Sequence, residues 1–155
     1  MPKKKPIKKT QMFHGTSKRL KSLKPKKHYL SEESVVFGSP LIEVALTFIA
    51  PWNDSEIEMG MVNNEPVHLI ELQKNSFKNI FEGKKGWIYM LDPTTFKWRQ
   101  NLTRFEYISE VAPKILDKVY IRDVLETLRD FEAQGLIQLV HFEDRKDFIK
   151  KGYRY

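Results

Sequence analysis

Short runs of apolar residues, separated by polar and turn-forming residues, predict that most of the chain forms brief strands. The runs are rich in β-branched and aromatic residues, which favour extended structure, and turn-forming residues close several of them. The first run ends at Gly15, and the run at 87–91 is closed by Asp92 and Pro93. We expect strands at residues 11–14, 35–38, 67–72, 87–91, 105–110 and 137–142.

Two segments have the pattern of helices. Ser39 and Pro40 are suited to the N-cap and first position of a helix. Apolar residues then follow at helical spacing, namely Leu41, Val44, Ala45 and Phe48. Residues 121–132 predict an amphipathic helix that Gly135 ends, and the polar, acidic residues 51–66 predict a surface loop. Since short strands outnumber helices, the expected fold class is α+β.

The length of 155 residues favours one domain, and 41% apolar residues are sufficient for a hydrophobic core. No apolar run approaches the roughly 18 residues of a membrane span, and the lysine-rich N-terminus lacks the apolar segment of a secretory signal. We therefore expect an intracellular protein, cytoplasmic or nuclear, with no membrane partner. The chain has no cysteine, which excludes disulfides, a thiol nucleophile and thiolate metal sites.

The net charge of +7 is concentrated near the N-terminus. Residues 1–28 hold 11 of the 27 Lys and Arg residues and no acid, whereas the rest of the chain holds 16 basic and 20 acidic residues. Residues 1–10 contain five lysines and two prolines, so we expect a disordered basic arm before one folded domain at 11–155. Such an arm favours polyanions such as nucleic acid, and a solubilising tail explains it equally well.

Several common catalytic and cofactor motifs are missing from the sequence. It contains no Gly-x-Gly-x-x-Gly dinucleotide motif, no P-loop, no Gly-x-Ser-x-Gly elbow and no RNP pattern. Three acids in the polar loop lack the glycine and terminal glutamate of a calcium loop. No two histidines have metal-ligand spacing, so no metal site is expected. The four histidines are His14, His28, His68 and His141.

Three short segments are the remaining candidates for chemistry. His14, Gly15 and Thr16 lie at the end of the first strand, a strand–helix corner follows at 35–40, and Glu106 lies at the start of a late strand. Each has an ordinary structural explanation when it is considered alone. A single histidine is more often structural than catalytic, and a single strand acid is more often exposed than functional.

Taken in order, the three segments resemble the ADP-ribosyltransferase fold, in the branch of diphtheria toxin and the poly(ADP-ribose) polymerases with its His–Tyr–Glu triad. The matching segments are Phe-His-Gly-Thr at 13–16, Val-Phe-Gly-Ser-Pro at 36–40 and Glu-Tyr-Ile-Ser at 106–109. Trp-Ile-Tyr-Met-Leu-Asp-Pro at 87–93 is similar to a strand of the small rifampin ADP-ribosyltransferases. The resemblance implies two small, strongly bent antiparallel sheets with few helices around an NAD cleft.

The resemblance also implies roles for individual residues. His14 would bond the adenosine-side ribose of NAD, and the backbone of Gly15 would bind the nicotinamide carboxamide, with Thr16 completing the motif. Glycine suits this position because a ligand has to approach the backbone closely. Glu106 would bond the nicotinamide ribose 2′-OH and stabilise the positive charge of the transition state. His14 and Glu106 are therefore the expected catalytic residues, and we expect them in one cleft.

The sequence departs from the family pattern at one position. The family tyrosine that stacks on nicotinamide matches Val36, which packs against a ring but has no phenol. Phe48, on the following helix, and Tyr29, in the preceding loop, are the two aromatic candidates to replace it. The absence of this tyrosine is expected to affect catalytic activity more than the fold.

Three functions are compatible with these observations. The first is an enzyme that transfers ADP-ribose from NAD to a protein or nucleic-acid acceptor; the second is a catalytically weak module that binds a nucleotide or ADP-ribose; the third is a basic, nucleic-acid-associated protein. Loops at residues 73–86 and 94–104 are expected to border the cleft and select the acceptor. Their basic and aromatic residues are Lys84, Lys85, Lys97, Trp98, Arg99 and Arg104.

Overall fold

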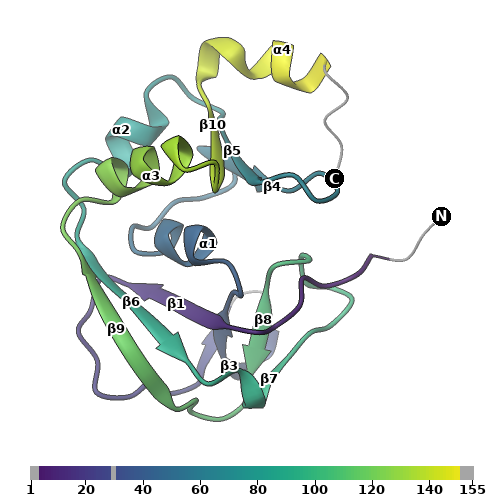
Figure 1. Ribbon diagram of the computed structural model, residues 1–155, viewed down its shortest axis with the longest axis vertical. Coiled ribbons are helices and arrows are strands. Elements are labelled where there is room, and N and C mark those ends of the chain that lie inside the picture. The colour runs from purple at the N-terminus through teal and green to yellow at the C-terminus, as the bar shows by residue number, and fades with distance from the viewer. Residues whose placement is uncertain (1–3, 29–30, 151–155) are drawn as a thin grey trace.

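The computed structural model describes residues 4–28 and 31–150, and of residues 27, 28 and 31–33 it describes the backbone alone. In this part of the chain the fold is α+β, with three small sheets and four α-helices (Figure 1). The strands are β1 (Met12–Thr16), β2 (Lys26–His28), β3 (Ser31–Gly38), β4 (Ile57–Gly60), β5 (Val67–Glu71), β6 (Gly86–Leu91), β7 (Phe96–Lys97), β8 (Tyr107–Ser109), β9 (Ile115–Ile121) and β10 (Ile137–Val140). The helices are α1 (Ile42–Thr47), α2 (Ser76–Phe81), α3 (Val124–Ala133) and α4 (Arg145–Lys150), with 3₁₀ turns η1 (Pro93–Thr95) and η2 (Phe142–Asp144).

The β6 sheet has the antiparallel order β1-β6-β9, and α1 packs against β1 on one of its faces. Gly15 makes this packing possible, because a Cβ at that position would overlap the backbone carbonyl of Ala45 in α1. Ile88 of β6 joins Leu46 of α1 and Leu125 of α3 in the main hydrophobic core. The helix α1 therefore fixes one face of this sheet.

The β3 sheet has the antiparallel order β2-β3-β8-β7. It meets the β6 sheet where Phe13 and Ser39 exchange two backbone hydrogen bonds, of 2.7 Å from Phe13 N and 2.9 Å from Ser39 N. Side chains of both sheets, among them Met12, Val36 and Tyr107, form a second hydrophobic cluster. The two sheets are thereby joined at the outer edge of β1.

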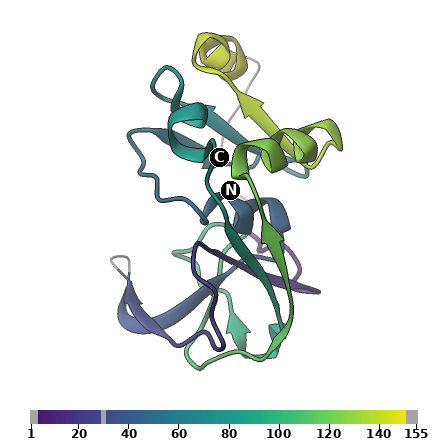
Figure 2. The same ribbon diagram turned by 90° about the vertical axis from the view of Figure 1, so that its left-hand side faces the viewer.

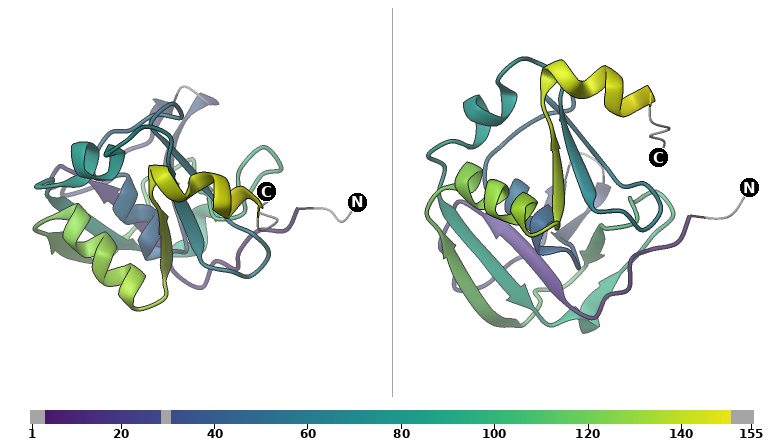
Figure 3. Two further views of the ribbon diagram at one scale, coloured as in Figure 1. Left: turned by 90° about the horizontal axis from the view of Figure 1, so that it is seen from above. Right: turned by 45° about the horizontal axis from the view of Figure 1, so that its top comes forward.

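The β5 sheet has the order β10-β5-β4, with β10 parallel and β4 antiparallel to β5. Figure 1 shows α1 between this sheet above and the β6 sheet below, and Figures 2 and 3 show β10 beside β5. Glu71, at the end of β5, is 3% exposed. Its Oε2 accepts from the backbone N–H of Phe77 (2.8 Å), and its Oε1 accepts from that of Phe142 (3.0 Å) and lies 3.5 Å from His141 Nδ1. This carboxylate ties α2 and η2 to the sheet.

The α+β class agrees with the sequence prediction, but the structure has three sheets where two were expected. The first helix begins at Ile42 rather than near Pro40, because the backbone of Ser39 pairs with Phe13 and its hydroxyl accepts from Leu41 N. Ile121 belongs to β9 rather than to a helix, and α3 begins after Asp123, whose side chain caps it. The expected loop at 51–66 contains β4, and neither β9, α2 nor α4 was predicted.

Residues 4–9 have no regular secondary structure, but they contact the folded body, which differs from the disordered arm that the composition predicts. Ile7 N–H donates to Arg104 O at 2.7 Å, and the Tyr107 hydroxyl donates to Ile7 O at 2.6 Å. The Ile7 side chain packs on a cluster that includes Val67 and Phe105. Arg104 Nε also donates to Lys5 O, and Lys9 Nζ donates to Phe96 O, so Ile7 and these hydrogen bonds together dock the arm. Residues 1–3 lie outside the described residues.

None of the helices that the structure describes combines the length and the apolar character needed to cross a membrane.

Candidate functional site

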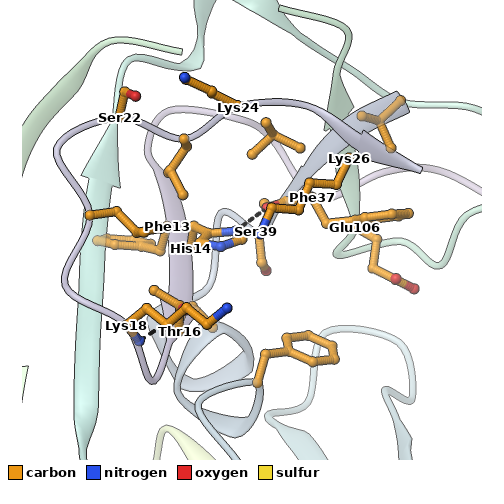
Figure 4. Close-up of a pocket in the computed structure, with 18 of the residues that line it drawn as sticks. Phe13, His14, Thr16, Lys18, Ser22, Lys24, Lys26, Phe37, Ser39 and Glu106 are labelled. Carbon is orange, nitrogen blue, oxygen red and sulfur yellow. Dashed lines mark hydrogen bonds between the residues drawn. The ribbon is translucent and has the colours of Figure 1, made fainter. Parts of the chain in front are cut away.

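A cavity of about 730 Å³ lies along the outer edge of β1 (Figure 4). This volume is within the roughly 300–1,000 Å³ typical of small-molecule sites. Strand β3, helix α1, the loop at 17–25 and Glu106 form the other walls. Six of the seven residues that the sequence singled out line this cavity: His14, Gly15, Thr16, Val36, Phe48 and Glu106. The seventh, Tyr29, lies outside the described residues.

The edge of β1 gives the cavity a backbone donor and acceptor. The N–H and C=O of Phe13 bond Ser39 and therefore point away from β6. Phe13 and Met90 of β6 thus form a non-hydrogen-bonded pair. In antiparallel sheets such pairs alternate along the strand, which directs the N–H and C=O of Gly15 to the same outer side. Gly15 lines the cavity, and in the described part of the chain Ser39, just after β3, pairs with this edge through an isolated bridge to Phe13. Gly15 therefore presents its backbone N–H and C=O to the cavity. Its lack of a Cβ allows α1 to pack closely on the strand.

His14 is held in a defined orientation and tautomer. Its Nδ1 lies 2.7 Å from the carbonyl oxygen of Phe37, and because a carbonyl only accepts, Nδ1 carries the proton. Burial lowers the pKa of His14; the hydrogen bond to Phe37 opposes this effect, and the charge of Lys26 adds to it. The imidazole is therefore neutral at pH 7, and Nε2 is a hydrogen-bond acceptor.

Glu106 reaches the same cavity through strand pairing, although it is 92 positions from His14 in the sequence. Tyr107 pairs with Gly38, so continuation of this register sets Glu106 against Ser39, whose backbone pairs with Phe13. Figure 4 shows Glu106 across the cavity from Thr16. Among the residues that the structure describes, no hydrogen bond or ion pair engages the Glu106 carboxylate. Its oxygens are thus free to meet a ligand.

The aromatic groups of the site lie at its border. Val36 is 3% exposed and gives the wall an aliphatic surface. Phe48, the C-cap residue of α1, is 48% exposed and stacks on Trp52 with centroids 6.0 Å apart. Phe48 is therefore not an ordinary core residue, and its position offers a ring face to the cavity. Phe37, which the sequence did not single out, also lines the cavity.

Four lysines line the cavity and were not identified as site residues from the sequence. They come from the loop between β1 and β2 and from the start of β2, and they are Lys18, Lys21, Lys24 and Lys26. The expected bordering loops, 73–86 and 94–104, contribute none of the lining residues. The acid-free, basic composition of residues 17–28 was the available signal.

Comparison with protein-family models, with curated proteins and with solved structures gives no match. The chemistry of the cavity is therefore argued from its own residues. Across the residues that the structure describes, no three His, Asp or Glu side chains are grouped as metal ligands. The cavity instead combines a backbone amide edge, a neutral imidazole acceptor, an open carboxylate, aromatic surface and ammonium groups.

Proposed function

We propose that the cavity binds NAD and that the protein is an ADP-ribosyltransferase-like enzyme, which transfers ADP-ribose from NAD to a nucleophilic acceptor. The observation that carries the proposal is that the open carboxylate of Glu106 and the amide edge at Gly15 line one cavity. The Glu106 carboxylate suits a positive charge that develops during a reaction, and the backbone edge at Gly15 suits a carboxamide. The nicotinamide riboside half of NAD has a carboxamide and a ribose carbon at which positive charge develops.

The remaining lining residues fit the rest of the molecule. The carboxamide of nicotinamide is both a donor and an acceptor, so it complements the N–H and C=O of Gly15 as an added strand does. Phe48 and Val36 supply apolar surface for the nicotinamide ring. The Nε2 atom of His14 accepts from a ribose hydroxyl, and the lysines attract the diphosphate.

The proposed reaction is a displacement at C1′ of the nicotinamide ribose. The bond from C1′ to the nicotinamide nitrogen breaks, and its electron pair leaves with neutral nicotinamide. An O–H or N–H group of the acceptor gives an electron pair to C1′ and loses its proton to the Glu106 carboxylate. Glu106 also stabilises the positive charge that develops at the ribose, an interaction stronger in the transition state than in the ground state.

The test compares two glutamates at the two ends of β8. Glu106→Gln is nearly isosteric but lacks the charge, so nicotinamide release, followed by chromatography, is expected to fall by about 100-fold or more. NAD affinity, followed by calorimetry, is expected to change by less than about threefold, since only transition-state binding is lost. Glu110→Gln is the matched control, because Glu110 is exposed and pairs with Arg99 at 2.9 Å outside the cavity.

Two results would contradict the enzyme proposal. One is undiminished nicotinamide release by Glu106→Gln; the other is a wild-type protein that neither binds millimolar NAD nor releases nicotinamide. NAD binding without turnover would support the second candidate, a binding module. Val36 favours the binding module, because it is the residue that matches the stacking tyrosine of the ADP-ribosyltransferase family and it has no phenol. Val36→Tyr would then be expected to raise turnover.

A further inference from the structure

A basic and aromatic surface continues from the cavity across one face of the β6 sheet. Side chains that oppose each other in antiparallel strands lie on the same face. Two rows cross from β1 through β6 to β9, namely His14–Tyr89–Lys118 and Thr16–Trp87–Tyr120. Gly15, between the two rows, faces α1 on the opposite side. Both rows lie on the face of the sheet that α1 does not cover. They run from the cavity residues His14 and Thr16 to Lys118 and Tyr120 of β9.

The loop at 17–25 lies on this face, and its residues line two separate hollows. The Tyr89 hydroxyl accepts from Leu20 N and donates to Lys18 O at 3.4 Å, which holds the loop on the sheet. Leu20 and Lys21 line both the cavity and a groove on the other side of the loop. We call this groove the β9 groove; its other lining residues are Arg19, Tyr89, Ile115, Leu116, Asp117 and Lys118.

The β9 groove is lined by the cations Arg19, Lys21 and Lys118. Two aromatic rings that do not line it, the partly buried Trp87 and the exposed Tyr120, lie beside it on the same face of the sheet. The Arg19 guanidinium lies 5.5 Å and the Lys118 Nζ 5.4 Å from the centre of the Trp87 ring. Tyr120, 48% exposed, lies 5.0 Å from Trp87 between ring centres, with a tilt of 58°. Asp117 is the acid that lines the groove, and its Oδ1 accepts from the backbone N–H of Lys118. The groove therefore favours an anionic ligand with planar groups.

The cavity and the groove together have a strong excess of positive charge. Their lining residues include two carboxylates, Asp117 and Glu106. The cations are Lys18, Arg19, Lys21, Lys24, Lys26 and Lys118. Cationic grooves bordered by exposed aromatic residues bind single-stranded nucleic acid, because phosphates meet the cations and unpaired bases stack on the rings. A duplex keeps its bases stacked internally and does not use the rings in this way.

We infer that the β9 groove binds a single-stranded polynucleotide. Given the proposed function, on which this part rests, the polynucleotide is the acceptor of ADP-ribose. Leu20 and Lys21 line both hollows, so a strand that leaves the groove across these two residues reaches the cavity and its lysines. A hydroxyl or a ring N–H group of one nucleotide then gives an electron pair to C1′ and its proton passes to Glu106, while nicotinamide leaves with the electrons of the broken bond.

The binding test uses the full chain without NAD and a 15-nucleotide, 5′-fluorescein-labelled single-stranded DNA of mixed sequence, followed by fluorescence anisotropy. The double variant Arg19→Glu/Lys118→Glu is expected to lose at least about tenfold in affinity, and wild-type binding is expected to weaken steeply between 50 and 200 mM salt. Tyr120→Ala is expected to lose about fivefold or more, and Tyr120→Phe to bind normally, since stacking needs only the ring.

The matched control is Arg129→Glu/Lys146→Glu, which changes the net charge equally at exposed positions of α3 and α4. It is expected to bind within about twofold of wild type. Equal losses in both double variants, or normal binding by Tyr120→Ala, would overturn the inference. So would a labelled duplex of the same sequence that binds more tightly than the single strand.

Transfer of radiolabelled ADP-ribose from NAD to the oligonucleotide tests the acceptor assignment. The Arg19→Glu/Lys118→Glu variant is expected to lose this transfer by about tenfold or more while nicotinamide release without oligonucleotide is unchanged. Nicotinamide release with no labelled oligonucleotide would overturn the acceptor assignment and leave the proposed function intact. Groove-dependent oligonucleotide binding by a protein that does not bind NAD would overturn the proposed function and leave the groove as a nucleic-acid site.

Discussion

Two glutamates lie beside buried strands in different regions of the molecule, and their surroundings differ. Glu71, at the end of β5, accepts from the backbone of Phe77 and of Phe142 and is almost fully buried. Glu106, just before β8, lines the cavity, and among the described residues its carboxylate has no hydrogen-bond or ion-pair partner. The fold uses the oxygens of Glu71 in its own hydrogen bonds and leaves those of Glu106 without a protein partner among the described residues.

The region around Glu71 and the region around Glu106 differ in the same way as the two carboxylates. The β5 sheet and its helices enclose apolar side chains and the satisfied Glu71, which is what a stable core requires. The β1 edge keeps an open backbone at Gly15, and the nearby Glu106 carboxylate has no protein partner among the described residues, so these groups contribute little to stability. We therefore expect substitutions in the first region to change stability and substitutions in the second to change binding and turnover.

The largest expected effect on stability comes from Glu71→Ala. This change leaves the buried N–H of Phe77 and the partly buried N–H of Phe142 without their acceptor and removes the link from the sheet to α2 and η2, so the free energy of unfolding should fall by about 2–4 kcal/mol. Urea denaturation measures it, with Glu106→Ala as the comparison variant. Glu106→Ala should change the same quantity by less than about 0.5 kcal/mol, because the Glu106 carboxylate has no protein partner to lose among the described residues. Similar losses in both variants would remove the distinction between the two glutamates.

Gly15→Ala should affect stability and binding together. The added Cβ would overlap the Ala45 carbonyl, so α1 or the strand edge has to move, at a cost of about 1–3 kcal/mol. Urea denaturation measures this loss, and calorimetry should show weaker NAD binding by the variant that remains folded. Full NAD affinity in a destabilised variant would show that the edge at Gly15 does not contact the ligand.

Glu43, in the first turn of α1, provides a third case, a glutamate that is 5% exposed. Burial raises the pKa of Glu43 to about 7. The folded protein thus retains a proton that the unfolded chain loses, and stability contributed by the neutral form is lost as pH rises from about 4.5 to about 7. Glu43→Gln should therefore stabilise the protein by about 1–3 kcal/mol at pH 8 and by almost nothing at pH 4.5. Thermal denaturation at the two pH values measures the difference, and a pH-independent effect would contradict this origin.

The sequence predicted the fold best where the pattern was strong. Strands β5, β6 and β10 arise from continuous apolar runs bounded by turn residues, which is why residues 67–72, 87–91 and 137–142 were identified. Strand β9 is the outer strand of its sheet, and Asp117 and Lys118 interrupt its apolar residues, so apolar and polar residues do not alternate regularly along it. Strand β4 is also an outer strand, and its polar surroundings concealed it.

For the candidate site, the sequence indicated residues but not their environment. The pairing of Phe13 with Ser39 and of Gly38 with Tyr107 brings the separate segments together, and long-range pairing leaves no signal in one sequence. The reason offered for Gly15 was incomplete, because its missing Cβ accommodates α1. The lysines that line the cavity were not predicted, because a run of charged residues in the sequence resembles any solvated loop.

The most direct test of the central claim is a titration of ¹⁵N-labelled protein with NAD, followed by amide chemical shifts. NAD binding along the β1 edge should shift the amide signals of Gly15 and Phe48 in proportion to saturation. The signals of Phe77 and Phe142, whose N–H groups bond Glu71, should stay unchanged. Shifts confined to those two signals, or no shift at Gly15 at several millimolar NAD, would contradict the assignment of the β1 edge as the NAD site.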